Sequence, residues 1–211
     1  MPKNAFLSTY RKLRYGEPIV VVSGLPRSGT SMAMKMLAAG GMVTVTDGQR
    51  TADEDNPKGY FEDERVKDLA KMDDKSWLSD ARGKAIKIIS FLLRELPPNH
   101  NYRVVFMRRD IEEILASQKK MLDRLGEADD ADDERMTTLF EGDLFRARYL
   151  MKHSPQFEFL EVRYRDALDD PEKVAAAIRD FVGVDLDLDE MVGVVDPELY
   201  RNRKERLAAG S

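Results

Sequence analysis

The chain has 211 residues, of which 42% are hydrophobic, enough for one α/β domain with a buried core. The charged share of 35% is mixed in sign and sums to a net charge of −5. This balance is typical of a solvated surface and argues against general binding to duplex nucleic acid.

Cysteine is absent, and the two histidines are His100 and His153. Their scarcity argues against disulfides, a cysteine nucleophile and a zinc site, and it fits a reducing compartment. The N-terminus lacks the apolar core of a secretory signal, and no apolar run reaches the ~18 residues of a membrane span. We therefore predict a soluble cytoplasmic protein with no metal, no membrane contact and no nucleic-acid partner.

Short apolar runs alternate with helical patterns along the chain. Strands are predicted at residues 19–23, 42–46, 85–89, 102–107 and 157–162, and helices at 30–39, 62–72, 91–96, 110–125, 134–152 and 171–182. Asp110 is expected to cap its helix, and Pro171 to open the last one. This alternation predicts a three-layer α/β sandwich with a central parallel sheet, in which ligands bind beyond the carboxyl ends of the strands.

One domain is expected over residues 1–211. Residues 126–153 contain an acidic run followed by a helical pattern, so they form either a lid or ordinary core packing next to a loop. Residues 198–211 form a basic C-terminal tail.

The first predicted strand runs directly into Gly24-Leu25-Pro26-Arg27-Ser28-Gly29-Thr30-Ser31 and then a helix. Two glycines at this spacing let backbone N–H groups surround an anion at the start of the helix, as in P-loop nucleotide-binding folds. An ordinary glycine-rich turn is the alternative. Thr30 stands where nucleotide triphosphatases carry a lysine, and the cation has moved to Arg27. The loop is therefore expected to bind a phosphate-like group without the usual metal machinery.

A second anion site is predicted at the end of strand 102–107. Arg109 precedes a helix, and Ser117 lies eight residues further on, at nearly the same helix face. Such a pair supplies one charged and one neutral donor to a phosphate. A surface arginine and a solvated serine are the alternative, and Arg108 is a second candidate for the charged donor.

Together, VVSGLPRSGTS and RRDIEEILAS resemble the two phosphate motifs of the sulfotransferases that use 3′-phosphoadenosine 5′-phosphosulfate (PAPS), including bacterial sulfotransferase-like proteins. The resemblance spans about residues 19–183. It implies that the first loop binds the 5′-phosphosulfate and that the second site binds the 3′-phosphate. The donor-binding residues that it implies are Pro26, Arg27, Ser28, Gly29, Thr30, Ser31, Arg109, Ser117 and Tyr164.

Tyr164 and one further segment near the C-terminus have alternative explanations. Tyr164 is equally well explained as a buried tyrosine at a strand end. A late basic cluster, Arg201, Arg203 and Lys204, loosely matches a segment that clamps the 3′-phosphate in the family, but a solvated helix explains it as well.

The resemblance also bears on catalysis. Sulfuryl transfer carries less charge than phosphoryl transfer, so protein cations can stabilise its transition state without Mg²⁺. Arg27 and Lys87 are the cations expected to do so. Lys87 matches the Lys of a family Lys-x-His segment, but Ile89 stands in place of the catalytic histidine and cannot accept a proton. His100 and His153 precede strands, at the wrong end of a parallel sheet.

A carboxylate base is therefore expected. The segment before Glu62 resembles an Asn-Pro-x-Gly-aromatic-aromatic-Glu stretch of bacterial sulfotransferase-like proteins, in which the glutamate is the candidate base. Alternatively, Glu62 only favours the dipole of the helix that it opens. Other candidates in this stretch are Asp53, Glu54 and Asp55 as the base, and Arg50 as a residue that orients it.

The sequence thus predicts a PAPS-dependent sulfotransferase that acts by in-line transfer to a hydroxyl or amine of an unspecified acceptor. An atypical P-loop kinase or NTPase is the first alternative, and Thr30 argues against it. The second alternative is a non-catalytic nucleotide-binding protein on the same fold. It is suggested by Ile89, which stands in place of the catalytic histidine. The oligomeric state is left open.

Overall fold

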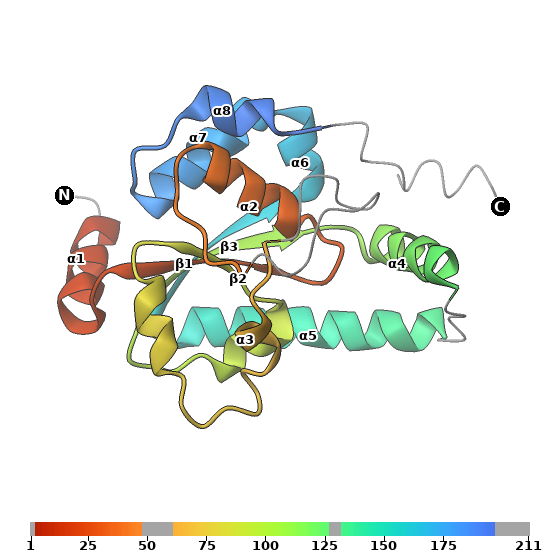
Figure 1. Ribbon diagram of the computed structural model, residues 1–211, viewed down its shortest axis with the longest axis horizontal. Coiled ribbons are helices and arrows are strands. Elements are labelled where there is room, and N and C mark those ends of the chain that lie inside the picture. The colour runs from red at the N-terminus through yellow and green to blue at the C-terminus, as the bar shows by residue number, and fades with distance from the viewer. Residues whose placement is uncertain (1–2, 48–60, 127–131, 197–211) are drawn as a thin grey trace.

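The computed structural model describes residues 3–47, 61–126 and 132–196 (Figure 1). Its centre is a four-stranded parallel sheet in the order β2-β1-β3-β4. The strands are β1 (Pro18–Gly24), β2 (Ala85–Lys87), β3 (Asn101–Arg108) and β4 (Phe157–Arg163). Because Gly24 pairs with Met107 and Arg108 with Arg163, the carboxyl ends of β1, β3 and β4 meet at one edge of the sheet.

Helices cover both faces of this sheet. Figure 1 shows α2, α7 and α8 on one side and the long α5 on the other. The helices, with η marking 3₁₀ helices, are α1 (Lys3–Tyr15), α2 (Thr30–Ala39), α3 (Glu64–Lys67), η1 (Ser76–Ala81), η2 (Ser90–Glu95), α4 (Ile111–Leu125), α5 (Asp133–His153), α6 (Tyr164–Asp169), α7 (Pro171–Val182) and α8 (Leu188–Gly193). The predicted three-layer sandwich with a parallel central sheet is confirmed.

The β-branched run of β1 explains its central place. Side chains alternate between the faces of a strand, so Ile19 and Val21 enter the core on the α5 side, whereas Val20 and Val22 enter the core on the α2 side. All four are essentially inaccessible to solvent. A strand that is apolar on both faces is buried between two helical layers, as parallel sheets require.

The helix limits follow from local caps. The Asp110 carboxylate accepts a hydrogen bond from the backbone N–H of Glu112 and so begins α4, as predicted. Pro171 opens α7, whose bounds match the prediction, and the Asp170 carboxylate caps it. The predicted helix at residues 91–96 is the 3₁₀ helix η2, and the helix at 134–152 is α5.

Two predicted elements differ from the structure. Residues 42–46 are not a strand, because only Thr44 forms a bridge, with Ala85, and the segment leaves the sheet after two backbone hydrogen bonds to that residue. β2 itself has only three residues, so it offers little edge for a longer pairing. The helix predicted at 62–72 is the four-residue α3, which starts after the cap Asp63 and gives way to irregular turns.

The N-terminal helix α1 was not predicted. It is fixed to the amino-terminal edge of the sheet by Arg11, which donates a hydrogen bond to the Pro155 carbonyl and pairs with Glu158 at 2.9 Å. No helix in the part of the chain that the structure describes has the length and hydropathy to cross a bilayer.

Candidate functional site

The loop between β1 and α2 is built for a close approach to its backbone. Gly24 and Gly29 have φ angles of 148° and 102°, and Arg27 has a φ of 65°, which is rare for a residue with a side chain. A Cβ at Gly24 would lie 2.5 Å from both the Met107 carbonyl oxygen and the Ser28 Oγ, so only glycine fits. Backbone strain of this kind is concentrated at ligand-binding loops.

The Ser28 hydroxyl favours the interpretation that this loop binds a ligand. Its hydroxyl oxygen is buried and has no hydrogen-bond partner among the described residues. Leaving a buried hydroxyl without a hydrogen-bond partner costs the folded protein on the order of 1–3 kcal/mol of stability. Because the loop also opens the ten-residue helix α2, an anionic oxygen bound here satisfies both the hydroxyl and the first helical N–H groups.

The second predicted anion site adjoins this loop. Arg27 donates a hydrogen bond from Nε to the Ser117 Oγ at 3.1 Å, and Arg109 donates one from a terminal nitrogen to the Arg27 carbonyl at 3.2 Å. Ser117 is almost fully buried on α4. The structure therefore brings Arg27, Arg109 and Ser117 together.

Arg109 is held from two further sides. Its Nε pairs with the Glu113 carboxylate at 3.0 Å, one helical turn along α4, and its guanidinium lies 4.7 Å from the centre of the Tyr164 ring. Glu113 was missed by the sequence analysis, although its spacing of four residues from Arg109 is the signal for such a pair. Another missed residue, Met121, accepts a weak hydrogen bond from Arg27 at 3.9 Å through its sulfur.

Tyr164 lies against the first loop, as the first residue of α6. A Cβ at Gly29 would be 2.4 Å from the Tyr164 Cδ2, so the ring and the loop backbone are in direct contact. Burial is the main cause that raises the pKa of Tyr164, and it outweighs the opposing effect of Arg109. The phenol is therefore neutral at physiological pH and available as a hydrogen-bond donor.

The remaining predicted catalytic residues form an ion pair at the end of β2. Lys87 Nζ lies 2.9 Å from Glu62 Oε1 and donates a longer hydrogen bond, 3.4 Å, to the Ser31 Oγ at the start of α2. The Lys87 and Glu62 side chains are only 10% and 19% exposed. Lys87 thus connects the first loop with the candidate base.

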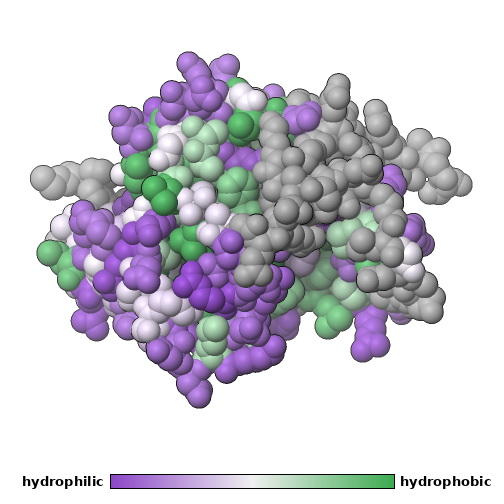
Figure 2. Space-filling view, in the orientation of Figure 1, coloured by the Kyte–Doolittle hydropathy of each residue, from purple (hydrophilic) through white to green (hydrophobic). Residues whose placement is uncertain are grey.

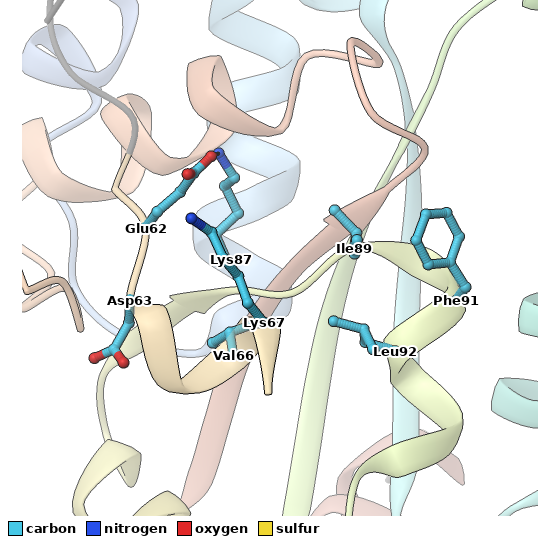
Figure 3. A pocket seen from close by; sticks show the side chains of 8 residues that line it. All are labelled: Glu62, Asp63, Val66, Lys67, Lys87, Ile89, Phe91 and Leu92. Atoms are coloured by element: carbon cyan, nitrogen blue, oxygen red, sulfur yellow. Dashed lines mark hydrogen bonds and ion pairs between the residues drawn. The ribbon is translucent and has the colours of Figure 1, made fainter. Parts of the chain in front are cut away.

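A pocket of about 340 Å³ opens next to this pair. Figure 3 shows the Glu62 carboxylate and the Lys87 ammonium together at one end, with Ile89, Phe91 and Leu92 opposite. Ile89, in the place of the family histidine, therefore contributes an apolar wall. The lining residues are Glu62, Asp63, Val66, Lys67, Lys87, Ile89, Phe91 and Leu92.

Several candidates lie elsewhere. Arg108 pairs with Glu161 on β4 at 3.5 Å and does not contact Ser117 in the structure. His100 and His153 precede β3 and β4, at the opposite edge of the sheet from the loop. Candidates outside the described residues are Arg50, Asp53, Glu54, Asp55, Arg201, Arg203 and Lys204.

The parallel sheet, together with the glycine-rich loop between β1 and α2 at its carboxyl edge, is typical of P-loop-like α/β proteins. A family model described as "Sulfotransferase family" matches residues 64–188, more than half of the chain. The chain therefore belongs to the sulfotransferase family, which confirms the resemblance found in the sequence. The matched range includes Lys87, Arg109, Ser117 and Tyr164, but it begins after the first loop and Glu62.

One solved structure, at a TM-score of 0.50, supports the fold, and two others are similar at lower scores. The chain is similar to the sulfotransferase domain from the curacin biosynthetic pathway, with a TM-score of 0.50, 13% identity and coverage of 85% of this chain and 78% of that one. A retinol dehydratase in complex with androsterone and the inactive cofactor PAP matches at a TM-score of 0.47, with 17% identity over 92% of this chain and 68% of that one. A sulfotransferase from Alicyclobacillus acidocaldarius matches at 0.48, with 15% identity over 92% and 91%. No curated protein matches the sequence.

Proposed function

We propose that this member of the sulfotransferase family uses PAPS as its donor and transfers the sulfuryl group to an acceptor hydroxyl or amine. The observation that carries the proposal is the direct contact between the two anion sites, through Arg27 and Ser117 at 3.1 Å. Two adjoining sites of this kind suit a small carrier with an anionic group at each end of one ribose.

The residues present fit such a donor. The loop backbone, the Ser28 hydroxyl and the start of α2 would hold the 5′-phosphosulfate, which supplies the sulfuryl group. Arg109 and Ser117 would hold the 3′-phosphate, as one charged and one neutral donor. The glycines at positions 24 and 29 leave room that a Cβ would fill.

Glu62 is the proposed general base. Its carboxylate lines the pocket and would take the acceptor proton as the acceptor oxygen or nitrogen bonds to sulfur, while the bond between sulfur and the 5′-phosphate oxygen breaks and adenosine 3′,5′-bisphosphate leaves. The Lys87 ammonium lies 2.9 Å from this carboxylate and orients it, and it lies close enough to Ser31 to face the transferred group. Arg27 and Lys87 supply the positive charge that stabilises the transition state.

The pocket indicates what kind of acceptor this base serves. Val66, Ile89, Phe91 and Leu92 give the pocket an apolar lining beside its charged end. Its volume of about 340 Å³ lies at the small end of ligand pockets, which run from about 300 to 1,000 Å³. We infer a hydroxyl or amine on a small apolar body, such as a substituted phenol or a short alcohol, rather than a sugar.

The experiment is transfer from ³⁵S-labelled PAPS in the presence of EDTA, with a matched set of phenols, aliphatic alcohols and monosaccharides. We expect labelled product from the apolar acceptors and a strong loss of product with Glu62→Gln. In a parallel reaction with Mg²⁺ and without EDTA, transfer of the γ-phosphate of ATP to these acceptors would support the kinase alternative. Tight donor binding without transfer to any acceptor would support the non-catalytic alternative.

A further inference from the structure

The apolar lining of the pocket comes mainly from the start of the 3₁₀ helix η2. Three of the four apolar residues that line the pocket are Ile89, Phe91 and Leu92, which we call the apolar wall. Figure 3 shows them facing α3 across the pocket, and Figure 2 shows mainly hydrophilic side chains on the surface around α3. The placement of η2 therefore decides where the apolar wall stands and how large an acceptor fits.

Ser90 lies between the residues of the apolar wall but faces the interior. A 3₁₀ helix has about three residues per turn, so Ser90 and Leu93 share one face, and they are only 2% and 1% exposed. Phe91, on a different face, is 40% exposed. η2 packs on α5, and Leu93 belongs to the same core cluster as Phe140 and Leu144 of that helix. η2 therefore presents one face to α5 and another to the pocket.

A buried hydrogen bond joins η2 to α5. The Ser90 hydroxyl donates it to the Asp143 carboxylate, and Asp143 is only 7% exposed. In the described part of the chain, no cation pairs with this carboxylate. A carboxylate buried without a cation lowers stability, and an apolar side chain would fill the same space without that cost. The polar pair therefore calls for an explanation other than stability.

Fixed geometry is what this hydrogen bond adds. The apolar contacts between η2 and α5 do not by themselves set one rotation of η2, because the hydrophobic effect is non-directional. A hydrogen bond to a carboxylate is stronger than a neutral one and needs a narrow range of angles. At its far end η2 is held by Lys75, which donates a hydrogen bond to the Glu95 carbonyl at 2.9 Å. The bond from Ser90 to Asp143 holds the end next to the pocket.

We propose that Ser90 and Asp143 are positioning residues that determine acceptor specificity, because their hydrogen bond fixes η2 on α5 and thereby sets the distance from the apolar wall to Glu62. The inference rests on the proposed function, in which this pocket binds the acceptor. Neither Ser90 nor Asp143 lines the pocket, so both act through the apolar wall. Loss of the bond lets the wall shift and relaxes the limit on acceptor size, while the donor site stays as it is.

The size limit is measured by binding, without turnover. Phenols with para substituents of increasing length are titrated by calorimetry into the protein saturated with adenosine 3′,5′-bisphosphate, which carries no sulfuryl group to transfer. In the wild type we expect the affinity to rise with length until the pocket is full and then to fall about tenfold or more at the next member of the series. In Ser90→Ala we expect this fall to come at a longer phenol or to shrink to about threefold or less, with unchanged affinity for the nucleotide.

Three further variants separate position from stability. Ser90→Ala leaves a buried carboxylate without its donor and should melt at a lower temperature. In the double variant Ser90→Ala/Asp143→Leu both partners are apolar, so the melting temperature should recover while the size limit stays relaxed. Asp143→Asn keeps an oxygen that accepts the bond and should keep the wild-type limit. Asn101→Ala, which removes a buried hydrogen bond to the Gly16 carbonyl at the opposite edge of the sheet, should lower the melting temperature and leave the limit unchanged.

The outcomes distinguish this inference from the proposed function. A wild-type limit that persists in Ser90→Ala, or that returns with the melting temperature in the double variant, overturns the positioning role alone. If Ser90→Ala does not fold, the double variant decides. A wild type that binds none of the phenols, or all of them equally, overturns the acceptor pocket itself and this inference with it.

Discussion

The Arg27 guanidinium donates a hydrogen bond to the Ser117 hydroxyl over 3.1 Å, and so joins the loop after β1 to the middle of α4. This contact joins the two proposed anion-binding motifs, although Arg27 and Ser117 lie 90 residues apart in the chain.

Ser117→Ala should weaken the binding of adenosine 3′,5′-bisphosphate (PAP) without changing the fold. The hydroxyl is a neutral donor to a charged group, so the expected loss is on the order of tenfold to a hundredfold in affinity. Binding of 5′-AMP, which lacks the 3′-phosphate, should hardly change. Ser79→Ala, an exposed serine on η1, is the matched control. Equal losses for both nucleotides would remove Ser117 from the 3′-phosphate site.

Gly29→Ala should damage both stability and donor binding. Gly29 and Gly41 have similar φ angles, 102° and 98°, so alanine strains the backbone to a similar degree at each position. Only at Gly29 does the new Cβ also meet a neighbour, the Tyr164 ring at 2.4 Å, whereas nothing lies within 4 Å at Gly41. We expect a loss of about 1 kcal/mol for Gly41→Ala and a clearly larger one for Gly29→Ala. Thermal melting and PAP titration measure the two effects, and equal melting temperatures would contradict the contact.

Glu62→Gln should lower kcat by roughly a hundredfold to ten-thousandfold, because a general base contributes about that much. The affinity for PAP should stay the same, since Glu62 lines the pocket proposed for the acceptor and not the loop proposed for the donor. Glu64→Gln, which breaks an exposed pair with Lys67, is the control and should leave kcat unchanged. If both variants retain full activity, the base lies elsewhere.

The glycine-rich loop after β1 could be predicted from sequence because it lies within one short segment. The Arg109–Ser117 phosphate pair stays a prediction, since in the structure Arg109 pairs with Glu113 and Ser117 accepts a hydrogen bond from Arg27. Local rules also predicted the Asp110 cap. In contrast, the Arg27–Ser117 contact and the Lys87–Glu62 pair join separate elements, and only the packing of the sheet decides which elements meet.

The edge of the sheet shows the same limit. Residues 42–46 have the β-branched alternation of a strand, yet Val43 is 61% exposed and the segment keeps a single bridge. A strand needs a neighbour of matching length, and β2 ends after three residues. The sequence of 42–46 alone does not contain that information.

His100 should make the protein less stable in mild acid. Burial is the main cause that lowers its pKa, and the nearby Arg82 cation adds to the effect. Since the folded pKa lies below the unfolded value of about 6.5, the stabilisation is complete above that pH and is lost as the pH falls through the folded pKa.

Replacing His100 should remove this part of the acid dependence. Urea midpoints at about pH 7.5 and pH 5 should differ less in His100→Gln than in the wild type. His153→Gln, at an exposed position on α5, should keep the wild-type difference. An unchanged difference in His100→Gln would show that other groups account for the acid dependence.

The most direct test of the two-ended site is calorimetric titration of PAP and 5′-AMP into the wild type and Arg109→Ala, in EDTA. The wild type should prefer PAP strongly, because Arg109 is a charged donor in a largely buried place. Arg109→Ala should bind the two nucleotides about equally and keep its affinity for 5′-AMP. A wild type without any preference for the 3′-phosphate, or an Arg109→Ala variant that keeps the preference, would contradict the account.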